Sequence, residues 1–548
     1  MIGRMPIKET TMTKKYTGLV ALCLVVCLLF TGCAGINFGG YFQHLFTLLS
    51  GGSLMPFDRM EYTRPDMTNF QTVTEQCCQE AAAHKNLEDM VQTIYSFYNA
   101  YDDFYTNFAL AMIRYSQNQI DTHWMEEYQF CTQNTAQVDA ALDRFYRVLA
   151  KSSLREQLEG EDYFGPGFFN NYQGESIYDA YFTELLNKEA ELENAYYDII
   201  AQAGGDYGYS QVFYDTYGYR MAEIFVELVA LRQEQAEYAG YENYPEFAYD
   251  FYHIRDYTPA QAVSYLADIR AELAPLYIGL QTRKPDVTLY ACEENQMLGY
   301  VQNVAQSMGG EIAQAFADMQ SAGLYDIGYS ENKLDASFEI YLRNYRSPFV
   351  FVNPSGTDYD KLTFAHEFGH FCSDYLSYGS GAGVDVSEIF SQGMEYLSLC
   401  YGNQDTNLTK LKMVDSLCIF VEQAAYASFE HRVYGLEGEE LTVENVQALY
   451  DGICDGYGLT GDWTYVLINH FFTEPMYVIS YVVSNDAALQ LYQMEQDKTG
   501  AGLACLQRNM TTTKAYFLAF LQEAGLKSPF TNGRVQEVKE TLQSILGL

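Results

Sequence analysis

The sequence predicts a mainly helical protein with one small β element. Apolar residues follow helical spacing over long stretches, for example in 87–97 and 222–230. No stretch alternates between apolar and polar residues for long enough to indicate a large sheet. The 548 residues include 48% hydrophobic side chains and 12 prolines. This is a globular composition, and such a chain can bury a large core in one elongated domain or in several lobes.

The β element is predicted at residues 347–356, which read Ser-Pro-Phe-Val-Phe-Val-Asn-Pro-Ser-Gly. The apolar, β-favouring core lies between Pro348 and Pro354, and proline is tolerated mainly at strand ends and on edge strands. We therefore expect an edge strand near 348–354. An exposed strand edge can bind an extended peptide as an additional strand.

The N-terminus has the pattern of a secretory signal. Residues 19–30 are apolar, Lys14 and Lys15 precede them, and Thr31-Gly32-Cys33 follows. A helix of this length reaches about 18 Å, short of the roughly 30 Å hydrocarbon core of a membrane. We expect residues 1–32 to be a signal peptide and 33–70, rich in Gly and Pro, to be a tether. Residues 29–33 resemble a bacterial lipobox, which implies that Cys33 is lipidated and anchors the protein outside the cytoplasm.

The charge of the chain excludes some partners. There are 32 basic and 72 acidic residues, giving a net charge of −40. Binding to nucleic acid or to anionic lipid needs clustered Lys and Arg, so we expect no nucleic-acid partner and membrane contact through the lipid alone. Nine cysteines follow Cys33 in no metal-ligand spacing, and we expect most of them to be buried thiols.

The strongest chemical signal is His366-Glu367-Phe368-Gly369-His370. Residues four apart lie on one face of a helix, so both imidazoles can bind one ion, and Glu367 lies beside it as a base for water. Two unpaired buried imidazoles would be costly, and a metal accounts for them. We expect this helix to begin with Thr357 as its N-cap.

A third ligand is expected from the following segment. The glycine-rich turn at 379–383 precedes a predicted helix at 385–397, which would return beside the first helix. Glu388, in its first turn, is then the candidate third ligand of one Zn²⁺ per chain. Glu395, seven positions later, either holds the second nitrogen of a ligand histidine or is a solvated carboxylate on the helix surface.

Together, His-Glu-Phe-Gly-His and the later Glu-x-x-Ser-Gln-x-x-Glu resemble the thimet oligopeptidase and oligoendopeptidase F family of zinc metallopeptidases. Residues 237–244, 349–356 and 524–526 extend the resemblance, which covers about 200–548. It implies an elongated helical metallopeptidase with a deep central cleft that admits short peptides, and Glu388 as the third zinc ligand. We expect an N-terminal helical region at 71–200 and a catalytic region at 201–548.

The same resemblance directs attention to His470, Tyr477 and Tyr481. In oligoendopeptidase F-like chains a similar histidine, followed by closely spaced tyrosines, lies across the cleft from the metal. Tyr477 and Tyr481 are four residues apart, so we expect them on one helix face. A phenol hydroxyl there can donate a hydrogen bond to the oxyanion that forms when water attacks a peptide carbonyl.

The sequence therefore favours a zinc endopeptidase that cuts oligopeptides at the outer face of the cell membrane. One alternative is a zinc carboxypeptidase or dipeptidase, which is also built on a His-Glu-x-x-His helix. Another is a lipid-anchored peptide-binding protein with weak or no catalysis. Glu367 argues against the last alternative, because binding alone needs no base. The sequence does not fix the oligomeric state.

Overall fold

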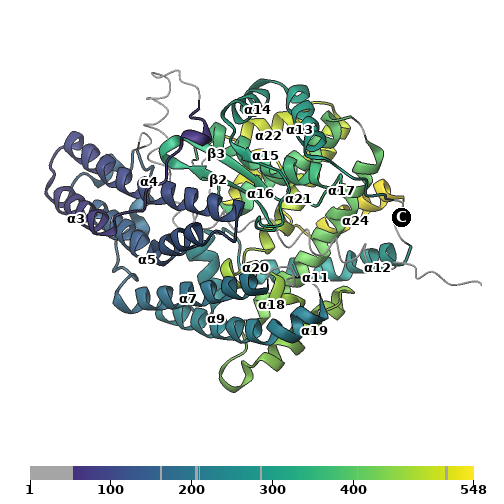
Figure 1. The fold of residues 1–548 in the computed structure, drawn as a ribbon, viewed down its shortest axis with the longest axis horizontal. Helices are drawn as coiled ribbons and strands as arrows, with labels where there is room; N and C mark the ends of the chain where they lie inside the picture. Colours follow the sequence, from purple (N-terminus) through teal and green to yellow (C-terminus); the bar gives the residue numbers. More distant parts are fainter. Residues whose placement is uncertain are drawn as a thin grey trace, which may run out of the picture.

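The computed structural model describes residues 54–160, 163–203, 208, 210–283, 287–379, 381–403, 405–512 and 516–547. The predicted signal peptide, Cys33 and most of the predicted tether lie outside these residues. The described part is mainly helical and contains one three-stranded sheet, so the predicted fold class is confirmed (Figure 1).

Long helices form the N-terminal part of the described chain. Asn86 begins the longest of them, since its side chain accepts a hydrogen bond from the backbone N–H of Asp89. Figure 1 shows the first three helices on one side of the molecule and the next two below them. These helices are α3 (Met67–Ala83), α4 (Leu87–Gln117), α5 (Thr122–Ala150), α7 (Ala180–Ala203) and α9 (Tyr219–Tyr238), joined by the short α6 (Arg155–Leu158) and α8 (Gln211–Phe213).

The remaining helices surround the sheet and continue to the C-terminus. The helices that precede the strands in the sequence are α10 (Tyr244–Phe247), α11 (Pro259–Glu272), α12 (Ala274–Arg283), α13 (Glu294–Met308) and α14 (Gly310–Ala322). The first two that follow the strands are α15 (Asp360–Ser377) and α16 (Val384–Tyr401). After them come α17 (Thr406–Cys418), α18 (Ala424–Val433), α19 (Val443–Tyr457), α20 (Asn469–Thr473), α21 (Ile479–Asp497), α22 (Ala501–Asn509), α23 (Phe517–Ala524) and α24 (Arg534–Leu546).

The sheet corrects one prediction. Its strands are β1 (Tyr325–Asp326), β2 (Ser337–Leu342) and β3 (Ser347–Val352), in the order β1-β3-β2. The segment expected at an edge is therefore the central strand, antiparallel to β2 and parallel to β1. Pro348 is compatible with this place because β1 pairs only with Val350 and Phe351, so no ladder bond to β1 is needed at residue 348.

The sheet connects the two halves of the molecule. Helix α4 packs against β2, and α15 packs against both β2 and β3. All six residues of β3 are buried, which explains why the strand is a continuous apolar run instead of an alternating one. The sheet thus fixes α15 relative to the N-terminal helices.

Helix α16 packs against both α15 and α21 in the core. Two glycines allow this close approach. A Cβ at Gly369 would lie 2.6 Å from Ser391 Cα and 2.7 Å from the Phe390 carbonyl oxygen, and one at Gly393 would lie 2.9 Å from Leu491 Cδ1. The glycine inside the histidine motif is thus required by the contact between α15 and α16.

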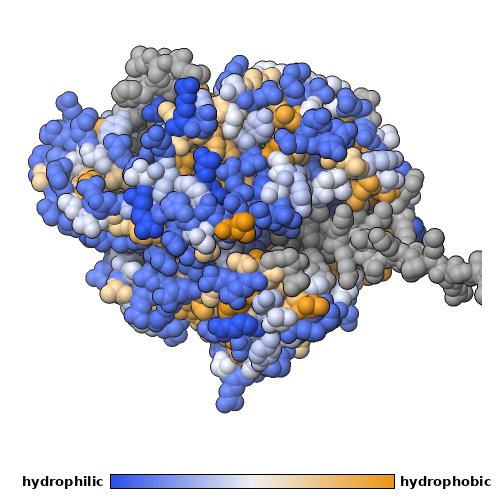
Figure 2. Space-filling view, in the orientation of Figure 1, coloured by the Kyte–Doolittle hydropathy of each residue, from blue (hydrophilic) through white to orange (hydrophobic). Residues whose placement is uncertain are grey.

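The surface and the cysteines agree with the composition. The face in Figure 2 is mostly hydrophilic, with hydrophobic residues in small scattered groups. All nine cysteines of the described part are free, and seven of them are buried. Within the described residues, the helices are all too short or too polar to cross a lipid bilayer.

Candidate metal centre and active site

The helix that carries the histidines begins differently from the expectation. Its N-cap is Tyr359, and Thr357 does not cap it. Instead, the carboxylate of Asp360 accepts hydrogen bonds from the backbone N–H groups of Ser355, Gly356 and Thr357 at 2.8–2.9 Å. An acid in the first turn of the helix therefore orders the loop from β3 and fixes where α15 starts.

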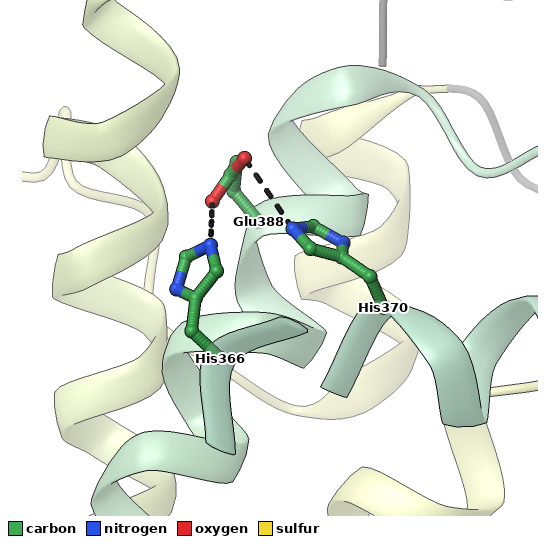
Figure 3. Close-up of side chains that lie close together, drawn as sticks. All are labelled: His366, His370 and Glu388. Atoms are coloured by element: carbon green, nitrogen blue, oxygen red, sulfur yellow. Dashed lines mark ion pairs between the residues drawn. The ribbon is translucent and has the colours of Figure 1, made fainter. Parts of the chain in front are cut away.

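Three predicted ligands converge in the core (Figure 3). Glu388 Oε2 lies 3.6 Å from His366 Nε2, and Glu388 Oε1 lies 3.7 Å from His370 Nε2. One ligand atom from each residue falls within 4.8 Å of the others. Two donors about 2 Å from a tetrahedral zinc ion lie about 3.3 Å apart, so a small contraction of this cluster would complete a zinc site with three protein ligands.

The unpaired polar atoms of the cluster indicate what it binds. The Nε2 atoms of His366 and His370 are buried without a hydrogen-bond partner, and so are both carboxylate oxygens of Glu367. Leaving a buried polar atom unpaired costs about 1–3 kcal/mol, so four such atoms side by side are unfavourable unless something binds them. The two imidazole nitrogens and the carboxylate of Glu388 are donors that suit zinc, so the residues present fit such an ion.

The other ring nitrogens of the histidines are held from behind. His366 Nδ1 lies 2.7 Å from Glu395 Oε1, and His370 Nδ1 lies 3.0 Å from Ser387 Oγ. Each contact leaves Nε2 directed at the cluster. Glu395 is only 4% exposed, so its reading as a solvated carboxylate is wrong and its contact with a ligand histidine is present.

Glu395 is in turn bound by a lysine that the sequence analysis did not single out. Lys412 Nζ lies 2.7 Å from Glu395 Oε2 and 3.0 Å from Asp415 Oδ2, and the lysine is fully buried. Tyr359 donates a hydrogen bond to the other oxygen of Asp415, at 2.7 Å. A buried chain of charges thus runs from α17 through α16 to His366, a candidate ligand on α15.

Burial and neighbouring charges shift the pKa values of the two histidines and of Glu367 in different directions. Burial acts to lower the pKa of His366, but the hydrogen bond that it donates to Glu395 and the charge of Glu388 outweigh burial and raise the pKa to about 9. Burial lowers the pKa of His370 well below its ordinary value. Burial also raises the pKa of Glu367 to about 8. Burial thus disfavours the carboxylate charge of Glu367, and a cation bound beside it would offset this effect.

Three residues were predicted to face the metal, and we call them the facing residues: His470, Tyr477 and Tyr481. They lie beside the cluster, but the two tyrosines are not on one helix. Helix α21 begins at Ile479, so Tyr477 precedes it and only Tyr481 is helical. The Tyr477 hydroxyl donates to Glu388 Oε1 at 2.7 Å, and the Tyr481 hydroxyl lies 3.2 Å from His470 Nε2. The rings of Tyr477 and Tyr481 are 5.3 Å apart. The structure thus brings all three residues together and places Tyr477 directly on a candidate ligand.

Two buried arginines hold this facing segment. Arg255 donates to the Met476 carbonyl and to Ser480 Oγ, both at 2.9 Å, and pairs with Asp385 of α16 at 3.2 Å. Arg232 donates to the carbonyl of Phe471 at 2.7 Å. Sequence reasoning missed both arginines, because their partners in this segment and in α16 lie more than 100 residues away and no local pattern marks them.

The chain also resembles known proteins. Residues 57–176 match the family model described as the peptidase M3 N-terminal domain. This part of the chain is therefore similar to the N-terminal domain of peptidase M3 proteins. The match lies in the region before residue 200, where the motifs had shown no resemblance. No curated protein matches the sequence significantly.

Solved structures match the fold over most of the chain. A PZ peptidase A with an inhibitor and a putative oligoendopeptidase F each superpose with a TM-score of 0.81, at 20% identity over 90% of this chain and 99% of the other. A putative oligoendopeptidase F from Bacillus anthracis str. Ames gives a TM-score of 0.78 with the same identity and coverage. The predicted resemblance is thus confirmed, and the M3 domain and the shared fold support a metallopeptidase that acts on peptides.

Proposed function

We propose that this protein is a zinc-dependent endopeptidase that hydrolyses short peptides. The observation that carries the proposal is the buried cluster of His366, His370 and Glu388, whose ligand atoms lie within 4.8 Å of one another. Glu367 lies next to this cluster with both carboxylate oxygens unpaired. A binding protein would have no use for such a carboxylate, whereas hydrolysis needs a base for water.

The residues divide the chemistry among them. Zinc bound to the cluster would supply a Lewis acid, which lowers the pKa of water and polarises a peptide carbonyl. Glu367 accepts the proton of the attacking water and returns it to the leaving amine. Ser387 and Glu395 orient the two imidazoles through their Nδ1 atoms, and Tyr477 orients Glu388 through its hydroxyl.

The facing residues act on the oxygen of the attacked carbonyl. The Tyr481 hydroxyl lies 3.2 Å from His470 Nε2, and the Tyr481 ring lies 5.3 Å from that of Tyr477, which binds Glu388. The Tyr481 hydroxyl, with His470 as its partner, is the best-placed donor to the developing oxyanion. Tyr477 is the second candidate, because its hydroxyl would first have to leave Glu388.

We further propose that the enzyme is attached to the outer face of a bacterial cell membrane through lipid on Cys33. The lipobox-like residues 29–33 support this proposal. Expression of the full chain and of Cys33→Ala in a bacterium, followed by membrane fractionation, tests it. The wild-type chain should sediment with membranes and the variant should not, and equal sedimentation would contradict the proposal.

The enzymatic proposal is tested with two kinds of substrate. The purified chain is incubated with internally quenched peptides and with free-ended peptides, with and without a chelator. Internal cleavage that is lost on chelation and restored by zinc supports the endopeptidase. Trimming only from one end supports a carboxypeptidase or dipeptidase, and binding without hydrolysis supports a peptide-binding protein.

A substitution assigns the base. Glu367→Gln should bind zinc as the wild type does and lose turnover by at least about a hundredfold, the usual contribution of a positioned general base. Zinc content and turnover are measured on the same sample. Retained turnover would remove Glu367 from its role.

A further inference from the structure

A cavity of about 190 Å³ separates the N-terminal helices from the segment that carries the facing residues. Its walls come from α4, α5 and α7 on one side and from residues 473–475 and His253 on the other. Four carboxyl side chains line it, and the described lining includes no lysine or arginine. These acids are Asp139, Glu189, Glu193 and Glu474.

Two of the four acids already have close partners. Glu189 accepts hydrogen bonds from Arg232 Nε and from Gln235 Nε2, both at 2.6 Å. Asp139 accepts a hydrogen bond from Tyr105 at 2.7 Å. Neither acid therefore needs a ligand in the cavity.

Glu474 differs from them. It is 3% exposed, and both of its carboxylate oxygens are buried without a hydrogen-bond partner. The nearest basic atom, His470 Nε2, is 3.8 Å from Oε2, beyond hydrogen-bond reach. A buried, unpaired carboxyl on the wall of a cavity indicates a missing donor inside that cavity.

Glu193 is the second acid without a close cation. Its nearest one is Arg232, whose Nη2 is 3.9 Å away and is shared with the carbonyl of Phe472. Burial, together with the charge of Glu189, raises the pKa of Glu193, and burial together with the charge of Glu193 raises that of Glu474. A cation between Glu193 and Glu474 would relieve both effects.

The cavity lies near the metal cluster, with His253 and Tyr477 between them. His253 lines the cavity, and its ring centroid is 6.5 Å from that of Tyr477, whose hydroxyl binds Glu388. Glu474 itself precedes Tyr477 by three residues. A peptide residue close to the cleaved bond can therefore place its side chain in the cavity.

The size and the remaining lining also suit an organic cation. A volume near 190 Å³ holds about six water molecules, a space comparable to the five non-hydrogen atoms of a lysine side chain. Seven tyrosines contribute to the walls, and aromatic faces attract cations. They are Tyr101, Tyr105, Tyr128, Tyr178, Tyr197, Tyr244 and Tyr252.

We propose that this cavity is a specificity subsite that binds a cationic group of the peptide substrate, with Glu474 and Glu193 as its acceptors. The group is a lysine or arginine side chain or a free α-ammonium. The inference rests on the proposed function only in that cleavage takes place beside the cavity.

Peptide series test the subsite. Internally quenched peptides carry lysine, norleucine or glutamate at each successive position, with free or acetylated N-termini. In the wild type, one position should favour lysine over norleucine by about tenfold or more in kcat/KM, the effect of a charge-assisted hydrogen bond. A preference that disappears on acetylation identifies the α-ammonium as the bound group instead. Either result supports the subsite.

Variants locate the preference. Glu474→Gln and Glu193→Gln keep the size of the side chain and remove its charge. Each should bring the ratio of kcat/KM for the lysine peptide to kcat/KM for the norleucine peptide toward one. Glu191→Gln is the matched control, because Glu191 lies on α7 but is exposed. The preference should also persist at about 0.5 M salt, which screens long-range surface steering but not a buried contact.

The result that overturns the subsite is separate from the result that overturns the peptidase. No cationic preference at any position, or a preference that both variants retain, contradicts the subsite even if peptides are cleaved. Absence of chelator-sensitive hydrolysis contradicts the proposed function. The affinities of the same peptides, measured by fluorescence anisotropy on the Glu367→Gln chain, report the preference without any turnover.

Discussion

Replacing Gly369 by alanine tests how the metal cluster is assembled. The added Cβ would lie 2.6 Å from Ser391 Cα and 2.7 Å from the Phe390 carbonyl oxygen, both backbone atoms of α16. Carbon atoms in contact need about 3.5 Å, so α15 and α16 would have to part by about 1 Å. The distances of 3.6 and 3.7 Å between Glu388 and the two imidazoles would increase with them.

The expected effects follow from that separation. Overpacking costs about 1–3 kcal/mol, and the gain in helix propensity from Gly to Ala returns about 0.5–1 kcal/mol. We expect the free energy of unfolding of the zinc-free chain to fall by about 1–2 kcal/mol. Zinc affinity should fall at least about tenfold, as when a ligand loses its orientation. Denaturant unfolding and competition against a chromogenic chelator measure the two quantities.

Gly452→Ala is the matched control. Gly452 also lies inside a helix, α19, but a Cβ there would meet nothing within 4 Å. This substitution should stabilise the protein by about 0.5–1 kcal/mol and leave zinc affinity unchanged. If Gly369→Ala behaved like Gly452→Ala in both assays, close packing of α15 on α16 would not be what positions Glu388.

Three further substitutions test other parts of the account. Lys412→Met leaves the buried Glu395 without its cation. The free energy of unfolding should therefore fall by about 3–5 kcal/mol, and zinc affinity by about tenfold or more. Unchanged values in urea unfolding and zinc titration would show that Lys412 does not support the site. Tyr481→Phe should lower kcat by about a hundredfold at unchanged zinc affinity, and an unaltered kcat would move the oxyanion donor elsewhere. Burial raises the pKa of Glu422 from 4.5 to about 7. The folded state therefore binds this proton more tightly, and wild-type stability should fall as pH rises between these values. Glu422→Gln should lack this loss of stability, which is about 3 kcal/mol at most. The Tm of the variant relative to that of the wild type should therefore rise with pH. A Tm difference that stays constant with pH would contradict the raised pKa of Glu422.

The parts of the site that the sequence predicted are those set by local spacing. Residues four apart share a helix face, which is enough to pair His366 with His370. Six residues lie between the end of α15 and the start of α16, few enough for α16 to return beside α15, and this return places Glu388 and Glu395. The short connection makes the antiparallel return almost unavoidable.

The parts that were missed depend on contacts distant in sequence. Arg255 reaches Met476, which is 221 residues away, and nothing near either residue indicates the pairing. Lys412 resembles any amphipathic helix lysine until the fold buries it against Glu395. Sequence patterns report which face of a helix is apolar, but not which buried charge meets which.

The strand and the helix start were mispredicted for a similar reason. The prolines around 349–353 indicated an edge strand, but β1 is so short that the central strand tolerates Pro348. Thr357 and Asp360 have the spacing of a helix cap, yet the loop from β3 turns its N–H groups onto Asp360 itself. In both cases a neighbouring element decided between two locally acceptable conformations.

The central claim is that one zinc ion is bound by His366, His370 and Glu388. Anomalous diffraction at the zinc absorption edge, from crystals of the chain purified with zinc, tests it most directly. The account predicts one anomalous peak per chain, about 2 Å from Nε2 of both histidines and from a carboxylate oxygen of Glu388. A peak at other residues, or a Glu388 carboxylate out of coordinating reach with no other acid in its place, would contradict it.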